Sequence, residues 1–297
     1  MEIIFLGTSH AVPTKEKNQT AILVRYNSEN ILIDCGEGTQ RQFKIAGLNL
    51  CKLTKILITH WHGDHILGLP GLLQSLALSN YNKTLEIYGP RGTKEFMKLL
   101  LEMFIFREKI KVNVHEISEG VFFENKDFCL EAKKMKHGAP CLAYSFSEKT
   151  KYKIDINKVK KAGFKEGPWL KDLQEGKDAK FEGKKVEFKK YTNQISGKKV
   201  SFILDTAINE NCFEIAKDAD LLISEACFLK SEEALASERD HLTAEQIANV
   251  AKKSKVGRLL LTHISQRYDK KEKIVLEEAK KIFKNSELAK DFMKIVI

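Results

Sequence analysis

Five short apolar runs, each followed at once by a polar or turn residue, recur along the 297-residue chain. They are ILID at 31–34, ILIT at 56–59, FILD at 202–205, LLIS at 221–224 and LLLT at 259–262. Strands that are buried on both faces have this length and this continuous apolar character, because helices cover both sides of their sheet. The pattern therefore predicts a layered α/β fold.

The segments between these runs carry helical patterns, which predict helices at 66–79, 93–103, 212–217 and 270–283. In the first of them a Gly-Leu-Pro-Gly stretch is expected to delay or kink the helix, because proline lacks a backbone N–H. Another helix is expected after Thr243, where the sequence TAEQ has the form of a capping box with Gln246 reaching back.

The composition is that of a folded globular protein, with 43% hydrophobic and 30% charged residues. Its six cysteines are scattered and include no CxxC pair, which argues against a disulfide framework or a structural zinc finger. The apolar run at residues 3–6 is too short for a signal peptide, and no stretch approaches the about 18 uninterrupted apolar residues of a membrane span. We therefore expect a cytoplasmic protein without membrane association.

Positive charge is concentrated in one part of the chain. The formal net charge is +10, and residues 149–199 hold 16 lysines, no arginine and 7 acidic residues, a local balance of +9. Glycine and proline punctuate this segment, which lacks sustained periodicity and has too few apolar residues to predict a core. It is expected to be an inserted arm or a long loop. Charge alone leaves open whether it is a solvated insertion or binds an anionic partner.

The stretch KILITHWHGDHILGL places four potential metal ligands within six residues, directly after an apolar run. They are His60, His62, Asp64 and His65. Because the chain turns sharply where a strand gives way to a helix, the first two can face one metal ion and the last two a second. Neutral imidazole and carboxylate suit a catalytic zinc ion, which keeps an open position for water. The cluster predicts a metal-dependent hydrolase.

Further ligands are expected at the carboxyl ends of other strands, where sites form in α/β folds. Asp205 ends one apolar run, His263 follows another, and His137 lies between a strand-like segment and a turn. Any one of them alone would more often be a turn or surface residue. Together with the first cluster they predict a binuclear site.

Three histidines remain outside this set. His241 stands just before the helix start at 243, where a proton donor to a substrate and a plain loop residue are both compatible with the spacing. His10, in a loop, and His115, in an alternating strand, are more typical of surface or hydrogen-bonding positions.

Motifs along the chain resemble those of a known family. The HxHxDH pattern at 60–65 is the signature of the metallo-β-lactamase superfamily, and the chain resembles the ribonuclease Z family over nearly its whole length. The resemblance rests on motifs in the family's order, namely FLGTSHAVPT at 5–14, ILIDCGEGTQRQ at 31–42, HGAPCLAY at 137–144, LDT at 204–206, HLT at 241–243 and LTHIS at 261–265. It implies an α/β fold of the metallo-β-lactamase type, a four-layer αβ/βα sandwich in which two mixed β-sheets are flanked by helices. Residues 1–297 would form a single domain with a basic inserted arm at about 149–199.

The resemblance also implies a function. The chain would be a zinc-dependent endoribonuclease that removes the 3′ trailer of precursor tRNA, leaving a 3′-hydroxyl on the tRNA and a 5′-phosphate on the trailer. Of two zinc ions per subunit, one would lie on His60, His62 and His137 and the other on Asp64, His65 and His263, with Asp205 bridging them. Asp64 is expected to orient the attacking water and take its proton, and His241 to protonate the departing 3′ oxygen.

The partners follow from the same resemblance. Ribonuclease Z proteins have a protruding arm with a Gly-Pro element, which Gly167 and Pro168 match, and this arm grips tRNA, often across a dimer. We therefore expect precursor tRNA as the partner, a homodimer, and phosphate contacts from the lysines. Two motifs depart from the family: PTKEKN at 13–18 has Lys17 where arginine would stand, and SEAC at 224–227 replaces HEAT but keeps Glu225.

Two other functions are compatible with the metal ligands. One is a small-molecule phosphodiesterase or thioesterase of the same fold, in which a basic arm would have no evident purpose. The other is a metal-stabilised RNA-binding protein without catalysis, which the intact ligand set and Asp64 argue against. A metal-dependent cleavage assay separates these alternatives.

Overall fold

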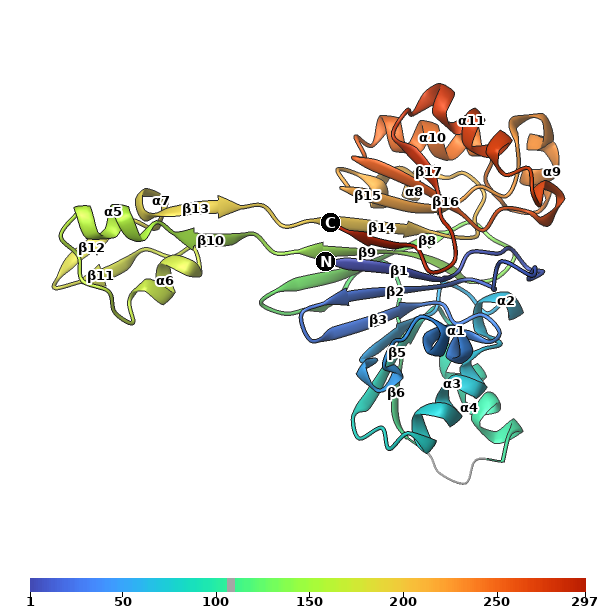
Figure 1. The fold of residues 1–297 in the computed structure, drawn as a ribbon, viewed down its shortest axis with the longest axis horizontal. Helices are drawn as coiled ribbons and strands as arrows, with labels where there is room; N and C mark the ends of the chain where they lie inside the picture. Colours follow the sequence, from blue (N-terminus) through green and yellow to red (C-terminus); the bar gives the residue numbers. More distant parts are fainter. Residues whose placement is uncertain (106–109) are drawn as a thin grey trace.

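Two seven-stranded β-sheets lie face to face, and helices cover the outer side of each (Figure 1). The computed structural model describes residues 1–105 and 110–297. The first sheet has the order β18 (Lys294–Val296), β1 (Glu2–Gly7), β2 (Ala21–Tyr26), β3 (Glu29–Ile33), β4 (Lys55–Leu57), β5 (Thr84–Gly89), β6 (Lys111–Glu116). The second has the order β17 (Ser286–Leu288), β16 (Arg258–Thr262), β15 (Leu221–Glu225), β14 (Lys199–Ile203), β9 (Cys141–Glu148), β8 (Phe128–Met135), β7 (Gly120–Glu124). This arrangement confirms the four-layer α/β sandwich with two mixed sheets.

Both sheets are mixed in the same way. In the first, β3 to β6 are parallel to one another, and β18, β1, β2 and β3 pair antiparallel. In the second, β14 to β17 are parallel, and β14, β9, β8 and β7 pair antiparallel. Each parallel half contains the apolar runs found in the sequence, so the carboxyl ends of these strands share one edge of their sheet.

Buried side chains fill the spaces between the four layers. In β1, Ile3 and Phe5 pack against the opposite sheet, whereas Ile4 between them packs against the helices of its own side. All three are 0% exposed. Because successive side chains point to opposite faces of a strand, both faces of this strand are buried. Burial of each such side chain stabilises the fold by about 1.5–3 kcal/mol, which accounts for the continuous apolar character of the runs.

Helices cover the two outer faces. Over the first sheet lie α1 (Thr39–Ile45), η1 (Leu50–Lys52), α2 (Gly63–Ile66), α3 (Leu69–Leu78) and α4 (Thr93–Met103). Over the second lie α8 (Glu210–Ala216), α10 (Ala244–Lys253) and α11 (Lys273–Ile282). The connection after β15 holds η2 (Lys230–Glu232) and α9 (Glu233–Glu238), and the connection after β16 holds η3 (Gln266–Tyr268). The capping box at the start of α10 forms as the sequence predicts, with Thr243 and Gln246 bonded reciprocally. In the described part of the chain no helix is long and apolar enough to cross a lipid bilayer.

The helix expected at 66–79 is divided in two. α2 ends at Ile66, and α3 begins at Leu69 with Pro70 in its first turn, where a missing N–H costs no hydrogen bond. Gly68, at the junction, lies against the turn at residues 35–36: its N–H donates to the carbonyl of Cys35 (2.9 Å), and an added Cβ would lie 2.0 Å from the carbonyl oxygen of Gly36. Only glycine fits there, so the residues just before the break are held against the first sheet.

The two sheets are joined directly at the edge where the parallel strands end. The backbone N–H of Leu142, in β9, donates to the carbonyl of Thr59, which follows β4 (2.9 Å). The hydroxyl of Tyr144, in the same strand, donates to the carbonyl of Ile58 (2.6 Å). The loops that follow the strands of both sheets therefore meet at one place, which is where the candidate metal ligands lie.

Residues 149–199, which we call the arm, project from the sandwich (Figure 1). β10 and β13 form an antiparallel stalk, and the tip holds short helices and a small hairpin. The arm elements are β10 (Lys151–Ile154), α5 (Ile156–Lys161), α6 (Leu170–Gln174), β11 (Ala179–Phe181), β12 (Lys184–Val186), α7 (Phe188–Tyr191), β13 (Thr192–Ile195).

The expectation that the arm has too few apolar residues for a core is wrong. Leu173, Ala179 and Val186 are at most 2% exposed, and aromatic side chains pack around them. The rings of Phe164 and Trp169 are 5.8 Å apart, within the range of favourable aromatic pairs. A count of apolar residues misjudged the segment because a few large rings bury as much area as many aliphatic side chains.

Candidate metal centre

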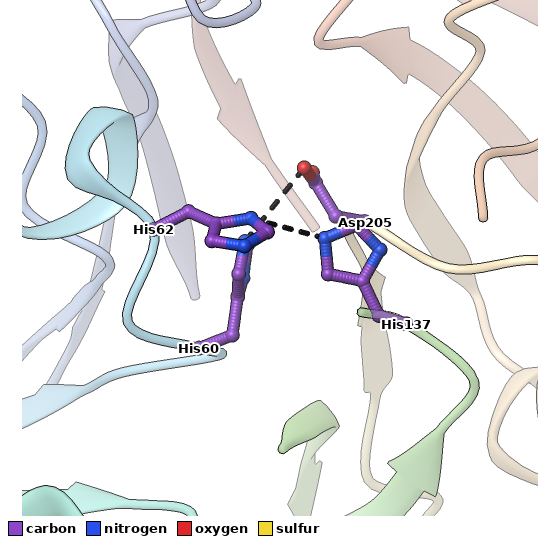
Figure 2. A group of neighbouring side chains, drawn as sticks. All are labelled: His60, His62, His137 and Asp205. Carbon is purple, nitrogen blue, oxygen red and sulfur yellow. Dashed lines mark hydrogen bonds and ion pairs between the residues drawn. The ribbon is translucent and has the colours of Figure 1, made fainter. Parts of the chain in front are cut away.

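Four of the predicted ligands converge on one point at the edge where the two sheets meet (Figure 2). His60 and His62 come from the loop after β4, His137 from the loop after β8, and Asp205 from the end of the run that contains β14. Nδ1 of His62 lies 3.1 Å from Nε2 of His137, and Nε2 of His60 lies 3.8 Å from Oδ2 of Asp205. One potential ligand atom from each of the four lies within 4.8 Å of the others.

A second group shares Asp205 with the first. Oδ1 of Asp205 lies 3.4 Å from Nε2 of His65 and 3.1 Å from Nε2 of His263. Asp64 completes the group, with its Oδ2 at 3.3 Å from Nε2 of His65 and 3.8 Å from Nε2 of His263. The two oxygens of Asp205 thus point to different groups, which is the arrangement that a bridging carboxylate requires. All seven side chains singled out in the sequence lie in these two groups.

The donor atoms have the properties of metal ligands. Nε2 of His60, His65 and His263 and Oδ1 of Asp205 are buried and have no hydrogen-bond partner within the described residues. Buried polar atoms without partners are rare, because each costs about 1–3 kcal/mol. A tetrahedral zinc ion with Zn–N bonds of about 2.0–2.1 Å would place its nitrogen ligands about 3.3 Å apart, close to the spacing of His62 and His137. The residues present therefore fit a pair of such ions.

The other nitrogen of each buried ligand is held by a hydrogen bond that sets the tautomer. Nδ1 of His65 donates to Oδ2 of Asp34 (2.6 Å). The hydroxyl of Thr59 donates to the same oxygen (2.7 Å), so its own oxygen is free to accept from Nδ1 of His60 (3.0 Å). Both rings therefore carry a proton on Nδ1 and turn Nε2 toward the shared carboxylate. Burial lowers the pKa of His65, but the carboxylates of Asp205 and Asp34 outweigh it and raise this pKa well above the ordinary value, so a metal ion would take the place of the proton on its Nε2.

His263 and His137 are oriented in the same way. The hydroxyl of Thr20 donates to the carbonyl of Ser9 (3.2 Å), which leaves its oxygen to accept from Nδ1 of His263 (2.8 Å). Nδ1 of His137 donates to the backbone carbonyl of Asp240 (3.1 Å). Anchors of this kind fix ring orientation before a metal ion arrives.

The ionisation states also suit cations. Burial lowers the pKa of His60 and His62, and the neighbouring imidazoles lower it further, so both rings are neutral near pH 7. Burial opposes ionisation of Asp64 and Asp205, but the imidazoles around them outweigh it and hold the pKa of both carboxyl groups below the usual range. Neutral imidazoles and ionised carboxylates are the ligand forms that bind zinc.

Two residues of the centre adopt left-handed backbone conformations. Asp34 has φ 55° directly after β3, and His263 has φ 52° directly after β16. Such conformations are uncommon for residues other than glycine and cost about 1–3 kcal/mol where the side chain does not favour them. Both conformations occur directly after a strand, at residues whose side chains point into the centre.

His241 lies at the rim of the centre and is paired with Glu225. Its Nδ1 is 3.1 Å from Oε2 of Glu225, whose Oε1 accepts from the backbone N–H of Thr206 (2.7 Å). Burial lowers the pKa of His241, but the Glu225 carboxylate outweighs this and raises the pKa to about 9. His241 is therefore protonated near pH 7, with its ring centre 5.4 Å from that of His137. Glu225 keeps this orienting position although the residues around it differ from the family tetrad.

Two residues that were not predicted to belong to the site, Asp34 and Thr20, anchor histidines of the centre. His10, which was expected at a surface or hydrogen-bonding position, lies against the centre: its ring is tilted by 54° to that of His263, with the ring centres 4.7 Å apart. The signal for Asp34 was present, because it ends an apolar run as Asp205 does. His115, by contrast, lies in β6 with its Nε2 2.6 Å from Oε2 of Glu86, outside both ligand groups.

The loop at 13–18 lies beside the centre rather than in it. Lys17, which stands where the family motif has arginine, forms an ion pair with Glu272. The backbone N–H of Asn18 donates to Oδ2 of Asp291 (2.8 Å), and Oδ1 of the same carboxyl group accepts from the hydroxyl of Thr8 (2.7 Å). The loop is thus tied to the C-terminal part of the chain.

Comparisons with known proteins agree with this geometry. Residues 1–165 match the family model described as Anti-Pycsar protein Apyc1. The chain is 38% identical over 298 residues to Ribonuclease Z of Methanothermobacter thermautotrophicus, covering 100% of this chain and 97% of that protein. Its structure is similar to that of human tRNase Z, short form, with TM-score 0.71 and 28% identity over 100% and 99% of the two chains. It is also similar to the metallo-beta-lactamase fold protein YhfI from Bacillus subtilis, with TM-score 0.70 and 19% identity over 99% and 98% of the chains, a likeness that shows the fold alone.

Proposed function

The chain belongs to the ribonuclease Z family, and from that membership we infer that it is an endoribonuclease that processes the 3′ ends of tRNA. Residues 1–165, which hold the loop at 60–65, also belong to the family described as Anti-Pycsar protein Apyc1. The protein is a metal-binding phosphodiester hydrolase. The observation that carries the function is the full-length match to Ribonuclease Z, together with two ligand groups that share one carboxylate.

We propose that the metal is zinc and that each subunit binds two ions. One ion would be held by His60, His62 and His137, the other by Asp64, His65 and His263, with Asp205 between them. The mixed imidazole and carboxylate donors support zinc, and the unpartnered Nε2 atoms support two binding positions. When bound, two such ions supply Lewis-acid polarisation of the phosphate and of a water molecule, together with a positive charge against which negative charge can develop.

The protein's own groups would then handle the protons. Asp64, 12% exposed and ionised, is placed to accept a hydrogen bond from the attacking water and to receive its proton. His241 is placed to donate a proton to the 3′ oxygen as its bond to phosphorus breaks. Glu225 keeps His241 charged until that moment and stabilises its orientation. The products of this reaction are a 3′-hydroxyl on the tRNA and a 5′-phosphate on the trailer.

We propose that the arm holds the body of the tRNA while the single-stranded 3′ end enters the centre. The arm carries a local charge of +9, and its folded tip presents the lysines on a fixed frame. Lysine contacts to phosphates would account for affinity and would make it fall steeply with salt. In this proposal residues 1–297 form one domain with the arm as its insertion. A small-molecule phosphodiesterase would have no use for such an arm.

A matched deletion tests this division of labour. Lys151 pairs with Ile195 at the base of the stalk, so residues 151–195 can be replaced by an Asn-Gly turn that closes the hairpin. Cleavage of precursor tRNA should fall far more than hydrolysis of bis(p-nitrophenyl) phosphate, a diester too small to reach the arm. Equal loss of both activities in the deletion variant would contradict the role of the arm. If the wild-type protein hydrolyses the small diester but leaves precursor tRNA intact, the chain is instead a small-molecule phosphodiesterase.

We further propose a cytoplasmic homodimer, because the resemblance to the family implies a dimer and precursor tRNA is processed where it is made. Sedimentation equilibrium measures the mass of the particle directly. A mass twice the 33.9 kDa of the chain supports the dimer, and a monomer at the concentrations used for catalysis would exclude it.

A further inference from the structure

A pocket of about 420 Å3 opens beside the metal centre. Its walls come from the loop that carries His10 and Val12, from η3, which carries Arg267, and from Arg239 at the end of α9. His10 lies between the pocket and the centre, because its ring centre is 4.7 Å from that of His263 and 5.5 Å from that of His241. A ligand that spans the centre and the pocket would pass beside His10. The pocket is of the size that takes up a small molecule or one nucleotide.

Arg239 brings an exposed guanidinium to this pocket. The guanidinium of Arg267 is already paired with Glu232 and lies over the ring of Phe228, 5.0 Å from its centre. Arg239 is exposed and forms no ion pair with any residue of the described ranges 1–105 and 110–297. Asp269 also lines the pocket, and because Glu232 compensates Arg267, the lining side chains carry no net charge. Arg239 is nevertheless a guanidinium without an ion pair among the described residues, and arginine can bind a phosphate through two parallel hydrogen bonds.

The backbone that carries Arg239 is fixed to the metal centre. The carbonyl of Asp240 accepts from Nδ1 of His137 (3.1 Å), and the N–H of His241 donates to the carbonyl of Ala236 (2.8 Å). The N–H of Arg239 itself donates to the carbonyl of Leu235 (3.1 Å). The backbone at Arg239 is therefore tied to His137 of the metal centre through the carbonyl of the next residue, Asp240.

The direction of the RNA follows from the role of His241. The oxygen that leaves phosphorus is the 3′ oxygen of the last nucleotide kept on the tRNA, so this nucleotide lies on the side of His241. The pocket lies next to His241, because His10 in its lining has its ring centre 5.5 Å from that of His241. We infer that it receives the nucleotide on the 5′ side of the cut, with the Arg239 guanidinium bound to the phosphate that precedes this nucleotide. The inference rests on the proposed function, because a small diester has no second phosphate to offer.

The test combines a protein variant with an altered RNA. Arg239→Ala and the control Lys83→Ala each remove one exposed positive charge, but Lys83 precedes β5, at the end of the strand remote from the centre. The metal content of each protein is measured first. Each protein is then assayed on two precursor tRNAs, which carry either the natural phosphate or a neutral methylphosphonate on the 5′ side of the last nucleotide that stays on the tRNA. For the wild type the methylphosphonate should raise KM about tenfold, because a charge-assisted contact is lost.

The expected result is that Arg239→Ala raises KM for natural RNA by the same factor and that the methylphosphonate adds little to it. The slope of log KM against log salt should also fall by about one in Arg239→Ala, and Lys83→Ala should match the wild type in both respects. If Arg239→Ala stays as sensitive to the methylphosphonate as the wild type, or behaves as Lys83→Ala, the inference is wrong while the proposed function stands. If the wild type does not cleave natural precursor tRNA at all, the proposed function falls and the inference falls with it.

Discussion

The pair formed by His241 and Glu225 can be tested by removing one charge from a buried side chain. Glu225 is 0% exposed, accepts from the N–H of Thr206 and lies 3.1 Å from Nδ1 of His241. Glu225→Gln keeps the size of the side chain and an oxygen that can accept from Thr206, but it removes the carboxylate charge. The variant should therefore fold while its His241 loses the group that keeps it protonated.

The size of the effect follows from the pKa of His241. Burial lowers this pKa and the Glu225 carboxylate raises it, for a net value of about 9 against the ordinary 6.5. Without the carboxylate the pKa falls to about 6.5 or below, a shift of at least about two units. On the alkaline limb, where the protonated fraction of His241 falls tenfold per pH unit, a shift of about two units lowers that fraction about a hundredfold at equal pH. Bound cations lower the pKa in both proteins alike, so the difference between them still reports Glu225.

The assay is the pH dependence of kcat/KM for precursor tRNA between about pH 6 and 10. Because the acid must be protonated, activity is lost as pH rises, and the alkaline limb of Glu225→Gln should move about two units toward acid. Glu245→Gln is the control, because Glu245 lies in α10 and pairs with Lys230 away from the centre. Coincident alkaline limbs for Glu225→Gln and the wild type would refute the argument that Glu225 sustains an acid at position 241.

Two further perturbations probe the supports of the site. Asp34→Asn places an amide where a carboxylate accepts hydrogen bonds from His65 and Thr59. The affinity for zinc, measured by competition with a chelator, should therefore fall about 10–100-fold. Unchanged affinity would show that Asp34 does not support the metal centre. Leu173→Ala deletes buried side-chain atoms from the small core of the arm, which should destabilise the arm by about 2–5 kcal/mol. Trypsin should then cut the arm before the rest of the chain, and KM for precursor tRNA should rise. An arm as resistant to trypsin as that of the wild type would show that this core does not hold the arm together.

The fold was predictable from the sequence where the signal is local and periodic. The apolar runs lie in strands, the expected helix at 93–103 has those bounds in the structure, and the Thr243 capping box forms. These features depend on the spacing of apolar side chains and on caps a few residues long, both of which are visible in a single sequence. The division of the helix at 66–79 was foreseen as an interruption, but its position depends on the contact of Gly68 with a turn far away in sequence.

The centre was predictable to the extent that its residues follow strands. His60, Asp205 and His263 were found because each ends or follows an apolar run. Thr20 was not found, because a hydroxyl that orients an imidazole across 243 positions of sequence leaves no local pattern. The core of the arm was missed because the segment shows no periodic apolar pattern, whereas its few aromatic rings pack together in the folded tip.

We propose that this chain makes a single endonucleolytic cut in precursor tRNA with a water molecule activated at the centre that includes His60, His62, Asp64 and His65. The most direct measurement is to incubate the zinc-loaded protein with one precursor tRNA and to determine the chemical ends of both products. We expect an intact trailer with a 5′-phosphate and a tRNA that ends in a 3′-hydroxyl. A trailer degraded one nucleotide at a time, or a tRNA that ends in a 3′- or cyclic phosphate, would contradict it.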